Sequence, residues 1–231
     1  MKKILIVACL HGSETFGLAV ANYFAKHKLA EVECIVGNPR AVALKVRFLD
    51  SDLNRSFGGA GKGYEGRRAA YLAQKIKDYN YVLDIHNTTT SVDSTPIAAN
   101  LSKKTLAILN LHPSSEVALM PPRLARHALI GNHSGAVSLE YSFSFSKKAA
   151  ALREVVAIVN SLLDGTPSKP KQRKVFYIKG TIPLTEGRPR IGKKFNFKYI
   201  PQIGGYGFLI GEEGYKTYQG FIATNVRKLI I

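Results

Sequence analysis

The chain has 231 residues, 45% hydrophobic and 21% charged, a composition typical of a globular protein with a hydrophobic core. No stretch approaches the roughly 18 consecutive apolar residues of a membrane-spanning helix, so the sequence predicts no membrane span. The formal net charge is +17, and residues 166–231 hold 13 of the 33 Lys and Arg residues but only 3 of the 16 Asp and Glu residues.

The first predicted element is a buried strand at residues 4–10, "ILIVACL". Two lysines, a short apolar run and Cys9 also resemble a lipoprotein export signal. The run, however, barely reaches the lower limit of about 7–15 apolar residues for such a signal, and it leads directly into His11. We therefore interpret it as a strand. Cys9 and Cys34 are then expected to be reduced thiols of a cytoplasmic protein, because two cysteines do not make a disulfide framework.

Apolar runs and amphipathic patterns alternate along the next part of the chain. The apolar runs predict strands at residues 4–10, 31–37, 80–87, 94–101, 116–120 and 135–143. Apolar residues at helical spacing predict helices at residues 15–27, 65–79 and 146–165, the last ending at Gly165. Strands alternating with helices favour βαβ units, so we expect a mixed, largely parallel central sheet flanked by helices.

A change in composition near residue 166 predicts a domain boundary. Residues 166–174, "TPSKPKQRK", are rich in Pro and Lys and are typical of a linker. Short β-type runs follow at 174–180, 195–200 and 206–213. The prediction is therefore an α/β domain at residues 1–165 and a small β-rich C-terminal domain at residues 166–231.

Two strands of the predicted sheet end in a histidine. His11 follows the strand at 4–10, with Glu14 three residues later, and His86 ends the strand at 80–87. Because carboxyl ends of parallel strands lie at one edge of a sheet, these side chains can converge. Two His and one Glu leave a fourth tetrahedral position open, as in catalytic zinc sites. Asp84, on the same face of the strand as His86, is either an acceptor that orients the imidazole or simply a solvated residue of the strand end. Taken singly, His11-x-x-Glu14 is more simply a helix cap, and a lone His a structural residue.

The segment at 38–57, "NPRAVALKVRFLDSDLNRSF", makes the pattern specific. Together with "HGSE" (11–14), "DIHNTT" (84–89) and "SLEYS" (138–142), it resembles the aspartoacylase/succinylglutamate desuccinylase family, relatives of the zinc carboxypeptidases. The matching pieces occur in family order across residues 1–142. This resemblance implies a zinc carboxypeptidase-like α/β fold and a hydrolase that uses one Zn²⁺ per chain.

The resemblance also implies roles for single residues in catalysis. His11, Glu14 and His86 would bind Zn²⁺. Glu140 would be the general base and acid, and Arg47 would polarise the scissile carbonyl.

Further residues are implied to bind the substrate. Asn54 and Arg55 would hold the substrate carboxylate, with Asp52 ordering their loop, because an arginine forms a planar fork that lysine cannot match. In "GEEGYKTYQGF" (211–221), Tyr215 would contact the substrate, with Tyr218 as the alternative. A second arginine would read another substrate carboxylate, and Arg126 is preferred to Arg123 for that role.

The sequence departs from the family pattern at several positions. These departures bear on which amino acid the substrate contains more than on whether its amide bond is hydrolysed. The chain is shorter than better-known members, mostly in its C-terminal part. The spacing from Arg126 to Glu140 is longer than expected, and Pro121-Pro122 replaces an aromatic residue of the family. The sequence "LEYSFS" stands where a Gly-Pro pair often follows the catalytic Glu.

The leading hypothesis is a cytoplasmic zinc-dependent amidohydrolase that removes the acyl group from a small anionic N-acyl amino acid, with an acidic acyl or amino-acid part. An alternative is a carboxypeptidase-like hydrolase acting on peptide C-termini. A third, of another class, is a basic nucleic-acid-binding protein with a vestigial zinc site; the sequence lacks a known nucleic-acid motif, and a basic field also suits anionic substrates. A membrane partner is not expected, and the oligomeric state is left open.

Overall fold

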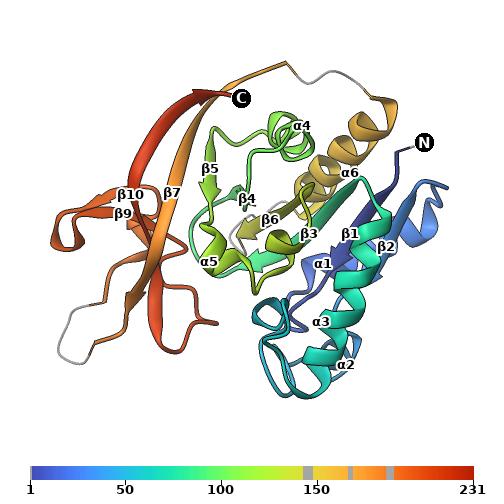
Figure 1. Ribbon diagram of the computed structural model, residues 1–231, viewed down its shortest axis with the longest axis horizontal. Coiled ribbons are helices and arrows are strands. Elements are labelled where there is room, and N and C mark those ends of the chain that lie inside the picture. Colours follow the sequence, from blue (N-terminus) through green and yellow to red (C-terminus); the bar gives the residue numbers. More distant parts are fainter. Residues whose placement is uncertain (1, 143–147, 166–168, 186–189) are drawn as a thin grey trace.

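The computed structural model describes residues 2–142, 148–165, 169–185 and 190–231, whose helices and strands are arranged as in Figure 1. The helices and strands are β1 (Ile4–Ala8), α1 (Phe16–Lys26), β2 (Val32–Val36), α2 (Pro39–Ala43), α3 (Gly63–Lys75), β3 (Tyr81–Thr88), β4 (Ser94–Ala98), α4 (Lys103–Leu111), β5 (Glu116–Leu119), α5 (Pro122–Ala125), β6 (Ala136–Ser142), α6 (Lys148–Asp164), β7 (Gln172–Pro183), β8 (Tyr199–Ile200), β9 (Gly205–Phe208) and β10 (Tyr218–Ile230). Short 3-10 helices are η1 (Leu53–Arg55), η2 (Ile76–Asp78), η3 (Leu129–Asn132), η4 (Lys193–Phe195) and η5 (Pro201–Ile203).

The strands form one ten-stranded sheet in the order β2-β1-β3-β6-β4-β5-β7-β10-β9-β8. Strands β2, β1, β3 and β6 pair parallel with one another in that order, whereas β4 runs antiparallel to β6. Strand β10 pairs antiparallel with β7 and β9, and β9 pairs antiparallel with β8. The fold is therefore a mixed, largely parallel sheet flanked by helices with C-terminal antiparallel strands, which confirms the predicted fold class.

The sheet separates two hydrophobic clusters, because its central strands are apolar on both faces. On one face Ile4 and Ile6 of β1 contact a cluster that includes the buried sides of α1, α4 and α6. On the other face Leu5 and Val7 contact a cluster with α3 and the region of α5. Figure 1 shows α6 and α3 on opposite sides of β1 and β3.

Most predicted elements of the first 165 residues are present, with shifted ends. The helix predicted at 65–79 ends as α3 at Lys75 and continues as η2, and the strand predicted at 94–101 ends at Ala98. Helix α4 was not predicted, although Ser102 caps it by accepting a hydrogen bond from the amide of Thr105 at 3.2 Å. Residue 143 of the predicted strand and residues 146–147 of the predicted helix lie outside the described residues.

The C-terminal strands continue the same sheet. Strand β7 begins at Gln172, inside the predicted linker at 166–174, and pairs parallel with β5 and antiparallel with β10. Residues 166–168 of that linker lie outside the described residues. Strand β10 was not predicted, and within the run at 195–200 only Tyr199–Ile200 is strand. The domain boundary at residue 165 stays a prediction.

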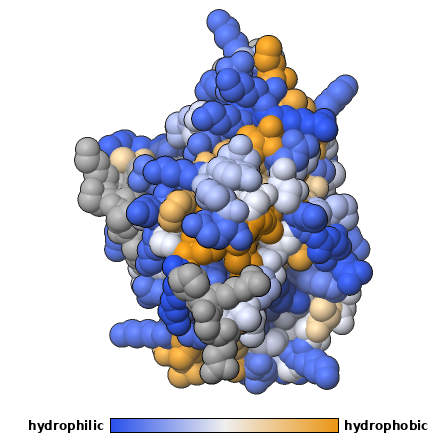
Figure 2. Space-filling model, turned by 90° about the vertical axis from the view of Figure 1, so that its left-hand side faces the viewer, coloured by the Kyte–Doolittle hydropathy of each residue, from blue (hydrophilic) through white to orange (hydrophobic). Residues whose placement is uncertain are grey.

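The face turned toward the viewer in Figure 2 is largely hydrophilic, with an apolar patch near its centre. A cavity of about 540 Å³ lies among the C-terminal strands and is lined by residues such as Ile182, Ile200 and Ile222. Across the described ranges, every helix is too short or too polar to span a lipid bilayer. Cys9 and Cys34 carry free thiols, as expected.

Candidate active site

The candidate site lies where β1, β3 and β6 end. Strand β1 ends at Ala8, and Cys9 then takes a left-handed conformation with φ of 57°, which turns the chain toward His11. Gly12 lies against the backbone of Ala41 so closely that no side chain fits there, and its amide donates to the carbonyl of Arg47 at 3.1 Å. The loop after β1 is thereby fixed to the segment that carries Arg47.

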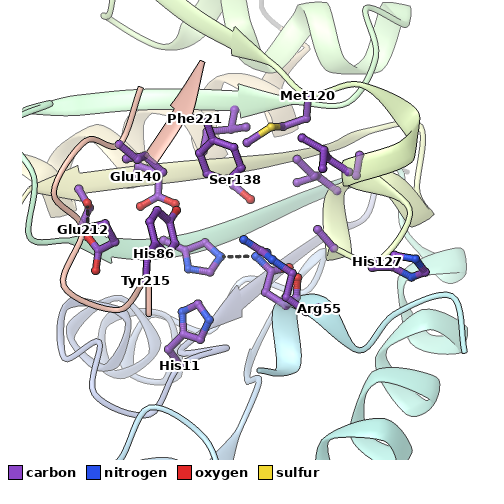
Figure 3. Close-up of a pocket in the computed structure, with 18 of the residues that line it drawn as sticks. His11, Arg55, His86, Met120, His127, Ser138, Glu140, Glu212, Tyr215 and Phe221 are labelled. Carbon is purple, nitrogen blue, oxygen red and sulfur yellow. Dashed lines mark hydrogen bonds between the residues drawn. The ribbon is translucent and has the colours of Figure 1, made fainter. Parts of the chain in front are cut away.

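The parallel pairing of β3 and β6 aligns two further residues. His86 is the register partner of Glu140, and Asp84 is the partner of Ser138 two residues earlier. Successive residues of a strand point to opposite faces, so these two pairs share one face of the sheet. Figure 3 shows His86 and Glu140 turned toward the same pocket.

His11, Glu14 and His86 converge, as their sequence pattern predicted. One donor atom from each lies within 4.8 Å of the others, and all three side chains are buried. Glu14 bridges the two rings: its Oε1 lies 2.5 Å from His11 Nδ1, and its Oε2 lies 3.0 Å from His86 Nδ1. The amide of Asn87 also donates to Glu14 Oε2 at 3.1 Å.

Each imidazole has a further carboxylate at its second nitrogen. Asp84 Oδ2 lies 2.9 Å from His86 Nε2 and accepts a 2.7 Å hydrogen bond from Ser138 Oγ. Asp52 Oδ1 lies 3.0 Å from His11 Nε2. Of the two roles considered for Asp84, its contact with His86 and its complete burial favour the orienting one, because such contacts fix the direction of an imidazole ring.

The charges of these side chains shift one another's pKa values. Burial alone would lower the pKa of His11 and of His86, but the adjoining carboxylates raise both above the ordinary value. Burial alone would raise the pKa of Glu14, yet the two imidazoles hold it well below its usual range. The cluster of carboxylates favours positive charge at this point, and a divalent cation supplies such charge when the imidazoles give up their protons.

Two imidazoles and one carboxylate are a donor set that fits zinc with one position left for another ligand. The orphaned Oδ1 of Asp84, buried without a hydrogen-bond partner, adds negative charge next to His86. The described residues thus fit a catalytic rather than a closed zinc site.

Glu140 lies at the inner wall of the pocket, with 8% of its surface exposed. Burial raises the pKa of Glu140 to about 7 from its usual 4.5. The His86 ring opposes this rise, while neighbouring carboxylates, Glu14 foremost, add to it. A carboxyl group with a pKa near neutrality can both accept and donate a proton at neutral pH.

Arg47 also reaches the metal-binding candidates. Its Nη2 lies 3.2 Å from His11 Nε2 and 3.6 Å from Asp52 Oδ2, and its Nη1 lies 3.8 Å from Glu14 Oε1. Its Nε is buried without a hydrogen-bond partner. The Arg47 guanidinium is therefore held beside His11, Asp52 and Glu14.

Asp52 caps the N-terminus of the short helix η1 and so orders Asn54 and Arg55. Its Oδ1 accepts a hydrogen bond from the amide of Asn54 at 2.9 Å. The Asn54 side chain accepts from the amide of Leu129 at 3.0 Å, and its Nδ2 lies 3.4 Å from His86 Nε2. The structure thus brings this predicted loop to the pocket.

Arg55 is exposed at the pocket and donates through Nη2 to the hydroxyl of Tyr218 at 3.3 Å. The rings of Tyr215 and Tyr218 are stacked, with centroids 4.3 Å apart, and both line the pocket. Both tyrosines considered from the sequence therefore lie at the site.

Arg126 lies apart from this arrangement. It is exposed at the end of α5 and donates through Nε to His127 Nε2 at 2.8 Å, whereas Arg123 is among the lining residues. The substrate-binding role of Arg126 stays a prediction. The sequence could not settle the choice, because Arg123 lies in the short helix α5 and Arg126 directly follows it, so their directions depend on how that helix packs.

Two buried or partly buried glutamates, Glu212 and Glu65, make contacts that were not predicted from the sequence. Glu212 Oε2 accepts hydrogen bonds from Thr88 Oγ1 (2.6 Å), Thr89 N (2.7 Å) and Thr89 Oγ1 (3.2 Å), and it lines the pocket. Glu65, fully buried on α3, accepts from the amides of Leu49, Asp50 and Ser51. The burial of Glu65 could have been predicted, because it lies one turn before Ala69 on the apolar side of the helix. No sequence pattern indicated the contacts of Glu212.

The pocket has a volume of about 210 Å³. In Figure 3, His11, His86, Glu140 and Tyr215 surround one part of it, and Met120 lies at the other end. The space accommodates a small molecule.

Known proteins resemble the chain in sequence. Residues 1–119 match the model of the succinylglutamate desuccinylase/aspartoacylase catalytic domain. An N-acyl-aromatic-L-amino acid amidohydrolase (carboxylate-forming) of Xenopus tropicalis is 28% identical over 196 residues, covering 71% of this chain and 62% of the relative. A probable aspartoacylase of Prochlorococcus marinus subsp. pastoris is 35% identical over 104 residues, covering 40% of this chain and 35% of the relative. The chain thus spans about three fifths of the length of the amidohydrolase.

Solved structures share the fold over nearly the whole chain. A mutant of murine aminoacylase 3 aligns with a TM-score of 0.75 at 17% identity, covering 99% of this chain and 94% of that one. Succinylglutamate desuccinylase from Chromobacterium violaceum aligns with a TM-score of 0.75 at 18% identity, covering 100% of this chain and 85% of that one. At these identities the likeness concerns the fold alone.

Proposed function

Because the chain belongs to the succinylglutamate desuccinylase/aspartoacylase family, we propose that it is a zinc-dependent amidohydrolase that removes the acyl group from a small N-acyl amino acid. One observation carries the proposal: His11, Glu14 and His86 converge in the pocket that also contains Glu140. The names of the relatives, which are amidohydrolases and aspartoacylases, support the same reaction class.

His11, Glu14 and His86 would hold the metal, with Asp52 and Asp84 orienting the rings. When bound, Zn²⁺ supplies a Lewis acid and lowers the pKa of a coordinated water to about 7. The fit rests on buried donors that already face one another and on the surplus of carboxylates around two imidazoles.

Glu140 would accept the proton of the attacking water and pass it to the departing amine nitrogen. Its pKa of about 7 suits both steps, since a group titrating near the working pH serves as base and then as acid. Burial keeps competing bulk water away from the carboxyl group.

Arg47 would stabilise the negative charge that develops on the scissile carbonyl oxygen. Its guanidinium lines the pocket and lies next to His11, with Nη2 at 3.2 Å from His11 Nε2, so a charged donor group is in place before reaction. Removing one such preorganised donor costs about 2.7–4 kcal/mol in comparable acyl-transfer sites.

Arg55 and Asn54 would bind the substrate carboxylate at the mouth of the pocket, with Tyr215 and Tyr218 beside them. Among the described residues, the Arg55 guanidinium donates to the Tyr218 hydroxyl and to the carbonyl of Asn54, and it keeps further donors for a carboxylate. Arginine binds carboxylates in a planar, two-point manner.

The test combines metal analysis with an assay of a panel of N-acyl amino acids, with zinc added and with zinc chelated. We expect about one zinc per chain and hydrolysis that chelation abolishes and zinc restores. His86→Ala should lose both metal and activity, whereas His27→Ala, which replaces an exposed histidine of the α1 C-terminus, should keep both. A metal-free wild type, or a fully active His86→Ala variant, would contradict the proposal.

A carboxypeptidase-like activity on peptide ends is the second candidate. It is favoured by the exposure of Arg55, which could bind the free carboxylate of a longer chain. Comparing N-acetyl amino acids with peptides of the same C-terminal residue separates the two. The volume of about 210 Å³ favours the smaller substrate.

A further inference from the structure

The cavity has two chemically different ends. His11, Glu14 and His86 form the polar end. The other end is lined by apolar side chains from β4, the end of β5 and the α5–η3 segment, each at most 9% exposed: Ile97, Met120, Ala125, Ala128 and Ile130. We call these five residues the apolar chamber. In Figure 3, Met120 and His11 lie at opposite ends of the pocket, with Ser138 and His86 between them.

The chamber is part of a hydrophobic cluster of the protein. All five of its residues belong to the cluster on the α3 face of the sheet, where they pack with side chains such as Leu129 and Phe176. Such packing fixes the shape of the chamber, because protein interiors are close-packed. A ligand group that enters it meets methyl, methylene and thioether surfaces that already have fixed positions.

The arginines that line the pocket have neighbours outside the chamber. Arg47 lies against His11 and Asp52, and Arg55 against Tyr218. Arg123 is exposed, and its guanidinium lies next to Gly180 of β7, where a side-chain carbon on that glycine would meet Nη2 at 3.8 Å. Among the described lining residues, these three arginines are the side chains that carry a permanent positive charge.

Polar groups of Ser138 and Asn54 in the pocket already have hydrogen-bond partners within the protein. Ser138 donates its hydroxyl proton to Asp84 at 2.7 Å, and the Asn54 carbonyl accepts from the amide of Leu129. The five chamber side chains carry no charge and no polar hydrogen, so a carboxylate placed among them would lose its water without gaining a hydrogen-bond donor from them. Burial of an unpaired charge is strongly unfavourable, whereas burial of an apolar group is favourable.

We propose that the substrate carries an uncharged, apolar group on one side of the scissile amide, and that this group occupies the apolar chamber, with Met120 and Ile130 as specificity-determining residues. This inference rests on the proposed deacylase function and replaces the acidic group expected from the sequence. The single carboxylate of such a substrate would remain for Arg55.

The first experiment measures kcat/KM of the zinc-supplemented protein for four substrates: N-acetylglycine, N-acetyl-L-aspartate and the two isomers N-acetyl-L-norleucine and N-hexanoylglycine. At least one isomer should exceed both N-acetylglycine and N-acetyl-L-aspartate by more than about tenfold, since each methylene in an apolar pocket is worth roughly 10–200-fold. The preferred isomer then assigns the chamber to the amino-acid side chain or to the acyl group.

Two variants locate the preference. Met120→Ala enlarges the chamber, so it should lower kcat/KM for the preferred isomer by about tenfold or more and shift selectivity toward a bulkier apolar group. Ile130→Arg should reduce the ratio of apolar to acidic substrate rates. Val159→Ala, which truncates a side chain buried on the opposite face of the sheet, should leave that ratio unchanged. Thermal unfolding curves show whether each variant is folded.

The outcomes separate the inference from the function on which it rests. If no N-acyl amino acid is cleaved by the zinc-supplemented protein, the deacylase proposal itself is wrong. If N-acetyl-L-aspartate is cleaved faster than both isomers, and Arg123→Gln abolishes that preference, the deacylase proposal stands and the apolar chamber is overturned. An unchanged ratio of kcat/KM for the preferred isomer to that for N-acetyl-L-aspartate in folded Met120→Ala also overturns it.

Discussion

The Glu212 carboxylate accepts a 2.6 Å hydrogen bond from the hydroxyl of Thr88, the last residue of β3. Two further hydrogen bonds from Thr89 reach the same oxygen, and the amide of Gly214 donates to the other oxygen at 3.1 Å. One side chain therefore ties the loop that carries Tyr215 to the strand that carries His86.

Replacing Glu212 by Ala should lower the kcat/KM for N-acyl amino acid hydrolysis by up to roughly 100-fold, because a displacement of about 1 Å in a substrate-positioning group has an effect of that order. Hydrogen exchange at residues 209–217 should become faster in the same variant. Glu213→Gln is the matched control, since Glu213 is exposed and its side chain contacts Lys193 at 3.4 Å. Equal rates in wild type and Glu212→Ala would show that the tie has no part in catalysis.

Asp84→Asn should weaken zinc binding by about 10–100-fold, because residues that orient metal-binding histidines have effects of this size. The buried Asp84 contacts His86 Nε2 and accepts from Ser138. Competition with a chelator measures the dissociation constant. Asp164→Asn, at the exposed end of α6, should bind zinc as wild type does. Unchanged affinity in Asp84→Asn would contradict the orienting role.

Glu140 should make the metal-free protein less stable at alkaline than at acid pH. Its folded-state pKa is raised to about 7 from 4.5, so the folded protein binds the proton more tightly than the unfolded chain does. The resulting stability is present below pH 4.5 and is lost as the pH rises through 7, by about 3 kcal/mol in all.

Glu140→Gln removes this dependence. In the presence of a chelator, urea unfolding at pH 8 should show a free energy of unfolding about 3 kcal/mol higher for the variant than for wild type. At pH 4 the two free energies should be nearly equal. The same variant should lose deacylase activity with zinc present. A Glu140→Gln variant that is less stable than wild type at pH 8 would show that ionisation of the buried Glu140 carboxyl does not destabilise the fold.

Glu154 on α6 should stabilise the fold far from the pocket. Its Oε1 accepts from Ser94 Oγ at 2.8 Å and Tyr141 OH at 2.9 Å, and lies 3.0 Å from His112 Nε2. Burial alone would raise the pKa of Glu154, but the hydrogen bonds from His112 and Ser94 lower it.

Because its folded-state pKa lies below the usual 4.5, the stability from Glu154 is present above that pH and is lost as the pH falls below it. Glu154→Gln should therefore lower the free energy of unfolding at pH 7 by about 1–3 kcal/mol, a loss that shrinks toward pH 3. Urea titrations at both pH values measure this difference, and kcat/KM should be unaffected. A loss of equal size at both pH values would contradict the charge-dependent part of the argument.

The sequence was sufficient to predict the convergence of His11, Glu14 and His86, because each lies after an apolar run and parallel strands bring their carboxyl ends together. It also placed Glu140, Arg47 and the loop of Asn54 and Arg55 at one site through the family motifs. Each motif is a short continuous stretch of sequence next to a helix or strand, so it could be recognised without knowledge of distant contacts.

The features that were not predicted depend on distant contacts. Glu212 meets Thr88 across 124 positions of the chain, and no local pattern encodes that pairing. Strand β10 has irregular register against β7 between Tyr218 and Asn225, so its alternation of apolar and polar residues is broken. The direction of Arg123 and Arg126 follows from the packing of a four-residue helix.

The parallel pairing of β5 with β7 has a consequence for biosynthesis. His11, Glu14 and His86 all precede β5, whereas Tyr215 and Phe221, which close the pocket, arrive with strands that attach through β7. A growing polypeptide on the ribosome thus contains all three residues that could hold a metal ion before the Tyr215 and Phe221 wall of the pocket has been translated.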